Sequence, residues 1–492
     1  MNWQNPPYFL MINNEKQRST CCMLCKLMSL LILCLMTISD IFAQNKNVTS
    51  TVIPNKNHVG PYIMTDTIRK IDAPFCMPQL QRLQFPNRRV IVKMKKSGLS
   101  TQNIQDAIDK LADIGGGTVV IPCGRWKTGR IILKSNINLE IQEGAELKFS
   151  GSIKDYLPAV FTRDEGIEIY SLGAFIYACN AENIGVTGKG RIIGPSTDCE
   201  IFRINKDKAL NIEIVVNDKP LEERIYDGIQ NAEVFLPKTI APINCKNVLI
   251  EGVTLDRGLY WNIVPQYCEN VIIRGVTVTS FGHGRTDGID VESSRNVLIE
   301  YCSLDCQDDC YTIKSGRGKD GVKVGRPSEN IVIRYCIANR GAGGNVYMHN
   351  CVLDVTVQSF RFKTLRPRGG GVENVYIERV RARLKGPAFY CNMLGSINYQ
   401  LNKNGFNEGI LSAESMIFWL DTADSKAKTP SFYISKGIEV AEGEEKPAER
   451  MFMYNATDSM QVFDEGSAVA SFNEKYMLEG TTKEDKIAKV IF

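Results

Sequence analysis

The chain is poor in histidine, and past its first 43 residues no two cysteines are separated by just two residues. Only three histidines occur among 492 residues. Zinc sites in proteins draw mainly on histidine and on closely spaced cysteine pairs. We therefore expect no metal and no cofactor.

Clusters of basic residues interleaved with aromatics are also absent, and the net charge is only +4. A nucleic-acid groove needs a concentrated positive surface with aromatic side chains for stacking. Nucleic acid is therefore not an expected partner.

Long hydrophobic runs are missing too, except for a short one near the N-terminus. Lys26 precedes an apolar run over 27–38, and the small Ala43 follows it, which is the layout of a signal peptide over residues 1–43. The run is shorter than the ~20 residues that span a bilayer. We expect no membrane span and an exported monomer, periplasmic or extracellular.

What the sequence does contain is a repeat, an asparagine followed by alternating aliphatic residues. Each copy is typical of a short strand, and strand units repeated at one period indicate a solenoid whose coils bury their apolar faces against each other. The repeats predict an all-β fold, a parallel β-helix. They begin at Asn183, Asn247, Asn270, Asn296, Asn330, Asn345 and Asn374.

Cysteine positions follow the same repeat. Cys302, Cys336 and Cys351 each lie six residues after a repeat asparagine, while Cys245 and Cys268 each lie two before one. Equal phase places them in inward columns, where cysteine packs as a small hydrophobe. We expect a ladder of buried thiols and few disulfides.

A helix before the first coils is expected to cap the solenoid. Ser100 or Thr101 is its N-cap, a glycine run over 115–117 ends it, and one face is apolar, with Ile104, Ala107, Ile108 and Leu111. The predicted organisation is an N-terminal extension over 44–85, a β-helix catalytic domain over 86–400, and C-terminal coils or a cap over 401–492.

Three aspartates, Asp287, Asp308 and Asp309, interrupt strand-forming sequence. Asp287 and Asp308 are 21 residues apart, about one coil, so we expect them to be neighbours on adjacent coils ~4.8 Å apart. Asp309 shares their site if the chain turns there. Three carboxyls in one site cannot all ionise easily, so one pKa should rise. The alternative is that Asp287 and Asp309 merely cap turns.

Two cations, Arg361 and Lys363, alternate around Phe362 and should project from one face of a strand. Arginine can grip a carboxylate through two bonds, and lysine adds a point charge. An anionic sugar is the natural ligand. The alternatives are a solvated pair or partners for the aspartates.

These motifs resemble the polygalacturonase family, glycoside hydrolase family 28, over residues 78–395. "RTD" at 285–287 resembles the family's Asn-Thr-Asp, "QDD" at 307–309 its Gly-Asp-Asp, and "RFK" at 361–363 its Arg-Ile-Lys. "GGGTVVIPCGRWKTGRIILKSNINL" and "APINCKNVLIEGVTL" resemble its N-terminal coils. The resemblance implies a right-handed single-stranded parallel β-helix.

The resemblance also implies a function: hydrolysis of α-1,4-galacturonosidic bonds in a pectic polysaccharide or oligogalacturonide, with inversion. Asp308 would be the general acid, and Asp287 and Asp309 would hold and activate the attacking water. Arg361 and Lys363 would bind the galacturonate carboxylate.

Three departures from the family pattern stand out. Arg285 and Gln307 replace Asn and Gly, and Ala342 stands where the family has the histidine of Gly-His-Gly. The same place is short: successive repeat asparagines from Asn247 to Asn330 are 23, 26 and 34 residues apart, but only 15 residues separate Asn330 from Asn345. We infer a deletion of about ten residues. Either Arg361 and Lys363 would shift relative to Asp308, or a neighbouring strand would be lost to keep the register. Activity would be reduced or lost.

Two other functions are consistent with these residues: a non-catalytic pectin-binding pseudoenzyme and a pectin lyase on the same fold. Endo and exo action also stay open, although the long segment over 195–237 favours exo action by walling one end of a groove.

Overall fold

The computed structural model describes residues 56–205, 214, 217–340 and 347–356, and after these only short strands between residues 360 and 434. The expected signal peptide over 1–43 and most of 401–492 lie outside the described residues. Within the part that is described, no helix is both long and apolar enough to span a membrane.

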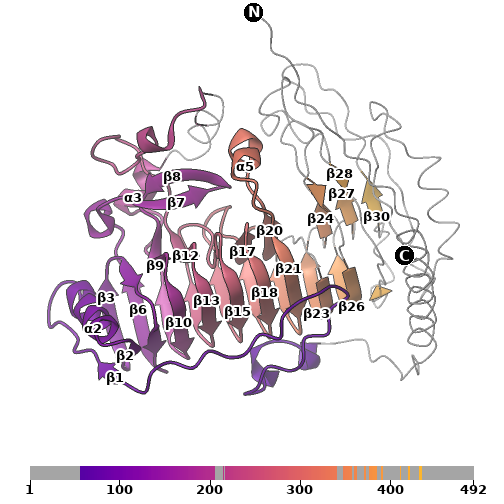
Figure 1. Cartoon of the computed structure of the whole chain (residues 1–492), viewed down its shortest axis with the longest axis horizontal. Coiled ribbons are helices and arrows are strands. Elements are labelled where there is room, and N and C mark those ends of the chain that lie inside the picture. The colour runs from indigo at the N-terminus through magenta and orange to yellow at the C-terminus, as the bar shows by residue number, and fades with distance from the viewer. Residues whose placement is uncertain are drawn as a thin grey trace, which may run out of the picture. The chain divides into compact units, whose positions relative to one another are not determined.

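Parallel strands stack coil upon coil, as the repeats predict (Figure 1). The first strand of each coil joins one long ladder, in which every pairing is parallel. This ladder runs through β1 (Arg89–Ile91), β2 (Gly117–Ile121), β5 (Ile137–Ile141), β10 (Glu182–Gly188), β13 (Lys246–Glu251), β15 (Glu269–Arg274), β18 (Arg295–Glu300), β21 (Glu329–Arg334), β23 (Tyr347–Thr356) and β26 (Tyr376–Leu384). The later halves of β23 and β26 continue the second ladder, where β29 (Trp419–Leu420) pairs with β26.

The second and third strands of the coils form two further ladders. The second comprises β3 (Gly124–Thr128), β6 (Ala145–Phe149), β11 (Arg191–Ile193), β14 (Thr254–Asp256), β16 (Thr277–Ser280), β19 (Ser303–Cys306) and β22 (Ile337–Arg340). The third comprises β4 (Ile131–Leu133), β9 (Ala174–Cys179), β12 (Lys238–Ile243), β17 (Ile289–Glu292) and β20 (Tyr311–Lys314), with bridges at Ile263 and Gln266 joining β12 to β17. The fold is a right-handed parallel β-helix, which confirms the prediction.

The repeat asparagines form a hydrogen-bonded ladder. Nδ2 of each donates to Oδ1 of the asparagine one coil earlier, at 2.9–3.1 Å, from Asn330 back to Asn183 and on to Asn136. All six have left-handed φ angles between 54° and 63°. Asparagine tolerates that conformation better than most residues, and its amide both donates and accepts. Asn345, the next by register, lies outside the described residues.

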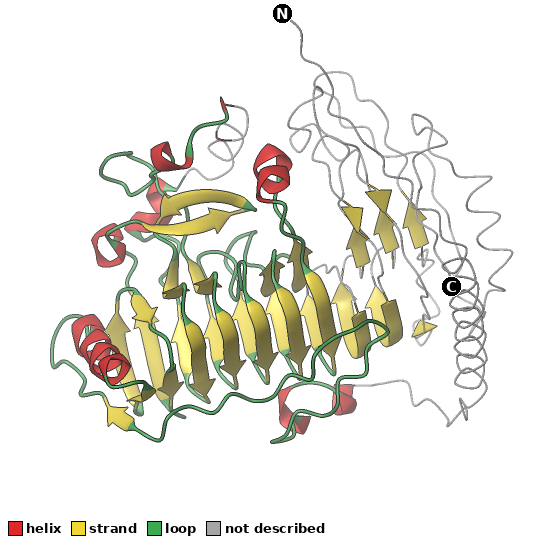
Figure 2. Cartoon of the chain, in the orientation of Figure 1, coloured by secondary structure: helices red, strands yellow, loops and turns green. Residues whose placement is uncertain are grey.

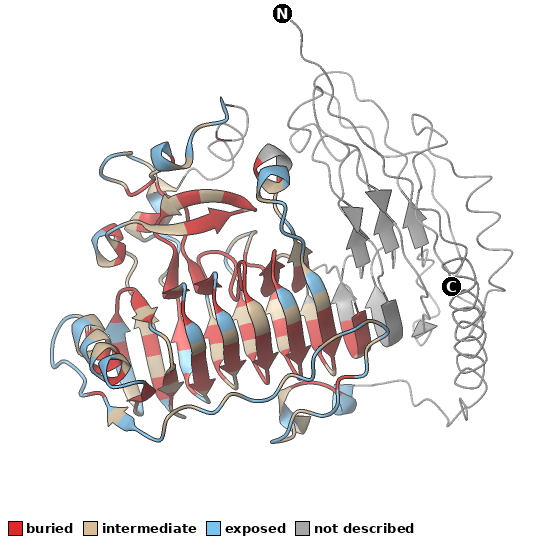
Figure 3. Cartoon of the chain, in the orientation of Figure 1, coloured by how far each residue is buried: buried red, intermediate tan, exposed pale blue. Residues whose placement is uncertain are grey.

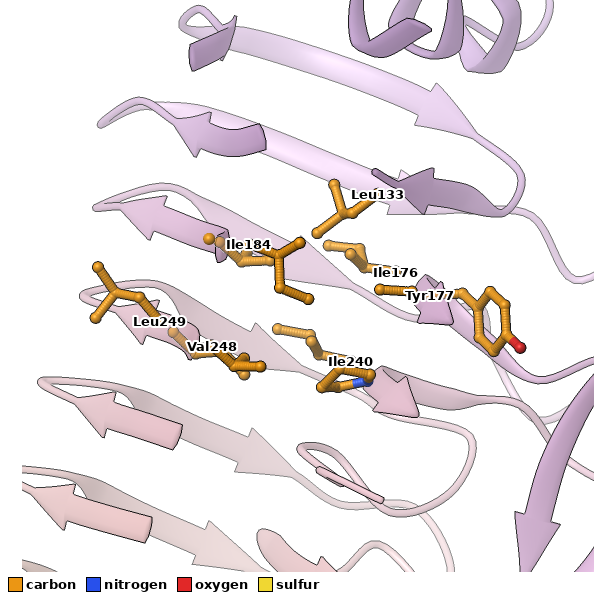
Figure 4. A pocket seen from close by; sticks show the side chains of 12 residues that line it. Leu133, Ile176, Tyr177, Ile184, Ile240, Val248 and Leu249 are labelled. Atoms are coloured by element: carbon orange, nitrogen blue, oxygen red, sulfur yellow. The ribbon is translucent and has the colours of Figure 1, made fainter. Parts of the chain in front are cut away.

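Inside the coils, aliphatic side chains fill a continuous core, and buried and more exposed residues alternate along the strands (Figure 3). Figure 4 shows part of this interior around Leu133, Ile176 and Ile240; the space left there is about 10 Å³, so it is packed core rather than a ligand site. The cysteine columns are confirmed. The cysteines of the described side chains are all free, and Cys245, Cys268, Cys302, Cys336 and Cys351 are buried.

The predicted capping helix is α2 (Thr101–Asp113), a helix at one end of the coils (Figure 2). Its buried residues are the four that its periodicity indicated. It packs against β2, β4 and β5 at the N-terminal end of the coils.

Residues 56–88, which we call the strap, run along the outer face of the first-strand ladder. Its 3-10 turns are η1 (Lys56–His58) and η2 (Pro61–Ile63). Gly60 donates its N–H to the carbonyl of Tyr335 at 2.8 Å. Ile71 packs on Leu298, Val332 and Tyr347. The strap therefore covers apolar side chains that point away from the coil interior.

The coil after Arg340 lacks a described third strand. β23 pairs with both β21 and β22, so the first-strand ladder keeps its register across the short coil. Only six residues separate β22 from β23, against 22 between β19 and β21. Among the described strands, β20 pairs only with β17, while β24 (Phe360–Phe362) pairs with β27 (Phe389–Cys391) and β27 with β30 (Phe432–Ile434). The residues between β22 and β23, where a third strand would fall, lie outside the described residues, so both outcomes expected from the deletion stay predictions.

An antiparallel hairpin, β7 (Val160–Asp164) and β8 (Ile167–Ser171), lies over the third-strand ladder together with α3 (Glu200–Ile204), η3 (Ile153–Tyr156), η4 (Leu221–Glu223) and α5 (Gly318–Val324) (Figure 1). A buried ion pair between Arg224 and Asp320 joins the 195–237 segment to α5. At the hairpin tip, Gly166 has a φ of 84°, and a Cβ there would lie 2.7 Å from Gly316. The hairpin tip thus packs directly against the segment after β20. The remaining short strands, β25 (Gly371–Val372) and β28 (Ile410–Leu411), pair with each other.

Candidate active site

Asp287, Asp308 and Asp309 come together, one oxygen of each lying within 4.8 Å of the others. Asp287 lies two residues before the start of β17, and the other two precede β20, the neighbour of β17 in the third-strand ladder. Asp287 is 4% exposed and Asp309 9% exposed. The sequence-based prediction of one shared carboxylate site is confirmed.

The register within the site differs from the prediction. Ile289 pairs with Tyr311, and the N–H of Gly288 bonds to the carbonyl of Asp309 at 2.8 Å. By this register, Asp309 rather than Asp308 is the neighbour of Asp287 on the next coil. The prediction was wrong because it counted the 21 residues from Asp287 to Asp308 as one rung, whereas the rung is 22 residues long.

Backbone hydrogen bonds fix Asp308 within a turn. Its carboxylate accepts the N–H of Arg285 at 2.9 Å and the N–H of Asp309 at 3.0 Å. Arg285 has a left-handed φ of 74°, which directs its N–H toward the next coil. Asp308 is thereby held by the loop that precedes Asp287.

Among the described groups around Asp287, negative charges outnumber positive ones. Burial raises the pKa of its carboxyl, and the charge of Asp290 raises it further, while Lys314 works in the opposite direction. The Lys314 ammonium lies 3.4 Å from Asp287 Oδ2 and also bonds to Asp290. It stands over the ring of Trp261, 3.3 Å from the centroid. The expected raised pKa therefore falls on Asp287, whereas the resemblance gives the acid's role to Asp308.

Arg285, one of the departures from the family pattern, turns its side chain toward the β7–β8 hairpin. Its guanidinium donates to Glu165 at 2.6 Å and to the Tyr260 hydroxyl at 2.8 Å, and it stacks over the Tyr260 ring. Arg317 bonds to the other oxygen of Glu165. Gln307, the second departure, accepts the N–H of Gly282 at 3.0 Å. Both replacements thus make contacts with loops next to the aspartates.

The predicted carboxylate-binding cations are not placed beside the aspartates. Lys363 lies outside the described residues, as does Ala342, and only the backbone of Arg361 is described, in β24. His283 is a loop residue whose ring packs on Phe202, and burial lowers its pKa. His349 lies within β23, as expected.

Sequence reasoning assigned no role to Asp290, Trp261 or Lys314. A usable signal was present: Asp290 and Glu292 on β17 and Lys314 on β20 place opposite charges on two strands that are neighbours in register. Charged residues at such positions need partners, so they should have been paired with each other.

The model of the glycosyl hydrolases family 28 matches residues 227–381, which include the aspartate site. A probable polygalacturonase of Vitis vinifera is 26% identical over 59% of this chain and 59% of its own length. An exo-poly-alpha-D-galacturonosidase of Dickeya chrysanthemi is 23% identical over 56% of this chain and 51% of its own length. The chain therefore spans between half and three fifths of these two relatives.

Among solved structures, an exopolygalacturonase from Thermotoga maritima superimposes with a TM-score of 0.53 at 27% identity. The match covers 70% of this chain and 93% of that one. Family model, relatives and fold agree with the motifs that surround the three aspartates: residues 227–381 match the glycosyl hydrolases family 28, and the chain is similar to polygalacturonases.

Proposed function

We propose that the protein hydrolyses α-1,4-galacturonosidic bonds of pectin by single displacement. The observation that carries this proposal is the convergence of Asp287, Asp308 and Asp309 from adjacent coils within 4.8 Å, inside the segment that matches the family model. Paired carboxyls in different surroundings are the recurrent equipment of glycoside hydrolysis, since one donates and another accepts a proton.

The proposed division of roles follows exposure and contacts. Asp308, the most exposed of the three, donates its proton to the glycosidic oxygen. Asp287 and Asp309 hold the attacking water and accept its proton. Arg361 and Lys363 bind the carboxylate of the substrate.

The test is to incubate the purified protein with polygalacturonate and to measure both reducing ends and the absorbance of unsaturated products. New reducing ends without unsaturation are expected. Unsaturated products would instead indicate a lyase. Asp308→Asn should lower the rate of hydrolysis at least ~10²-fold. Unchanged activity would show that Asp308 is not the general acid.

Inversion is tested separately by the anomer of the first product in an NMR time course. The nearest carboxyl oxygens lie within 4.8 Å, closer than the ~6.5–9.5 Å usual between the two carboxyls of inverting enzymes. We propose inversion on the family resemblance, and release of the retained anomer would overturn it.

A second candidate is a pectin-binding protein without activity, and the short coil after Arg340 favours it. That coil adjoins β20 and contributes no described third strand beside it. Retained binding of polygalacturonate with neither reducing ends nor unsaturated products would establish this candidate. Insertion of ten residues after Gly343 should then restore measurable hydrolysis.

We also propose export, through the leader over 1–43, to the periplasm or the medium, where pectic polymers are accessible, and action as a monomer. Fractionation of expressing cells and mass spectrometry of the mature N-terminus test the first, and size-exclusion chromatography with light scattering tests the second. Retention in the cytoplasm with an intact leader would overturn export.

A further inference from the structure

Among the residues that the structure describes, Lys314 is the cation that lies against Asp287. The groups that face Asp287 are otherwise acidic or neutral: Asp290 on β17, Asp308 and Asp309 in the turn before β20, Tyr260 before Ile263, Cys306 on β19, and Glu292 next to Lys314. Lys314 comes from β20, one coil away from Asp287, and its side chain is 26% exposed.

Three contacts hold the ammonium in place. Asp290 bonds to it, Asp287 Oδ2 lies 3.4 Å away, and the face of Trp261 lies 3.3 Å away. Thr312 donates its hydroxyl to the same oxygen of Asp290. A cation fixed between an aromatic face and a buried carboxylate has little freedom to leave. Lys314 is therefore a fixed charge rather than a mobile surface lysine.

This arrangement answers a difficulty in the proposed mechanism. A carboxylate that accepts a proton from water must be ionised, yet Asp287 is buried and surrounded by like charges, which favour its protonated form. An ammonium at 3.4 Å opposes those effects, although the pKa of Asp287 stays above its usual value. We propose that Lys314 is a positioning residue whose charge, shared between Asp287 and Asp290, favours the ionised form of Asp287 that its role as base requires. This inference rests on the proposed hydrolase function.

Asp290 has the opposite effect on Asp287. It competes for the ammonium, and its own negative charge repels that of Asp287. Lys314 and Asp290 therefore form an opposed pair, and removing each should shift the ionisation of Asp287 in opposite directions.

The experiment measures kcat/KM against pH for wild type, Lys314→Met, Lys314→Arg and Asp290→Asn. Lys314→Met should move the acidic limb upward by about 1–3 pH units, the range by which a nearby opposite charge shifts an aspartate. Lys314→Arg should move the acidic limb by less than about half of the shift expected for Lys314→Met. Asp290→Asn should move it downward. An unmoved limb in Lys314→Met, or Arg behaving like Met, would overturn the proposal.

A second measurement does not depend on activity. In Lys314→Met, Asp287 and Asp290 lose their counter-charge, so their folded-state pKa values rise further above the unfolded values. The folded state then binds more protons than the unfolded state, and stability falls as pH rises. The unfolding midpoint of Lys314→Met should therefore drop more at pH 7 than at pH 4, and that of Lys314→Arg should not.

The two readouts separate the two proposals. If the wild-type protein is inactive on polygalacturonate, the proposed hydrolase function is wrong. The unfolding midpoints at pH 4 and pH 7 still decide whether the charge of Lys314 acts on the aspartates. If the wild type is active, but Lys314→Met changes stability equally at both pH values and leaves the acidic limb unmoved, only the proposed role of Lys314 is wrong. If Lys314→Met fails to fold, the downward shift in Asp290→Asn carries the test, and no shift there overturns the proposal.

Discussion

Two buried charge clusters in this protein differ in their balance of sign. On the outer face of the first-strand ladder, Glu251, Arg274, Glu300 and Arg334 occupy the same position on four successive coils. Their signs alternate, and the ion pairs between neighbours measure 2.8–3.2 Å. We call this cluster the outer ladder. In the aspartate site, as far as the structure describes it, Asp287 has three further carboxyls around it, counting Asp290, and one nearby ammonium, that of Lys314.

The strap completes the outer ladder. Arg274 donates to the carbonyl of Thr65 at 2.6 Å, and Arg334 donates to those of Arg69 and Lys70 at 2.8 Å. By contrast, Asp287 Oδ1 and Asp290 Oδ2 are buried without a hydrogen-bond partner in the structure. Charges that are paired and hydrogen-bonded stabilise the fold. Carboxyls with too little counter-charge instead have raised pKa values, which a reaction that transfers protons can use.

The two clusters should differ most when one carboxylate in each is neutralised. In the aspartate site the variant is Asp287→Asn. Hydrolysis should fall by ~10²–10⁴-fold, because the proposed base is lost. The unfolding midpoint at pH 7 should stay the same or rise, because a buried carboxylate with an unpartnered oxygen becomes neutral. Reducing-end assays and thermal unfolding measure the two effects. A strongly destabilised but fully active variant would place Asp287 among the structural charges.

Glu300→Gln should do the reverse. It leaves Arg274 and Arg334 buried without their shared carboxylate, and breaking such a pair costs ~3–5 kcal/mol of unfolding free energy. Activity per folded molecule should not change, since Glu300 lies on the first-strand ladder and the aspartates on the third. Urea unfolding and kcat measured below the transition test this. A fall in kcat without loss of stability would show that the two clusters are coupled.

A smaller effect is expected where the strap meets the sheet through apolar contacts. Ile71 is buried against Leu298, Val332 and Tyr347, so Ile71→Ala should cost about 2 kcal/mol, at the low end for buried isoleucine because the strap can partly collapse onto the sheet. Limited proteolysis should show faster cleavage within residues 56–88. If cleavage is unchanged, the outer ladder alone holds the strap.

How far the sequence predicted these features depends on what fixes each residue. The asparagine repeat gave the fold, because each coil needs a residue that tolerates a left-handed turn and hydrogen-bonds to its neighbours. The thiol columns followed from the same phase. Asp287, Asp308 and Asp309 were also found, because carboxylates between apolar strands have few structural uses.

The details that failed depend on turns and on long side chains. The rung between Asp287 and Asp309 could not be counted without knowing where the turn residues lie, and Lys314 reaches Asp287 along four methylenes that no strand pattern fixes. The ordered alternation of the outer ladder is visible only once the register is known. Arg361 and Lys363 stay predictions, since their side chains lie outside the part of the chain that the structure describes.

The smallest effect should come from an ion pair that has the geometry of the outer ladder but not its burial. Arg295 bonds to Glu269 at 2.8 Å, as close as the pairs of Glu300, yet its side chain is 58% exposed, against 1% for Arg274. Water solvates an exposed guanidinium whether or not a carboxylate is near, so such pairs contribute little. Arg295→Gln should leave both the unfolding midpoint and kcat unchanged. A loss comparable to that of Glu300→Gln would mean that pairing itself, rather than the desolvation of the paired charges, makes the outer ladder structural.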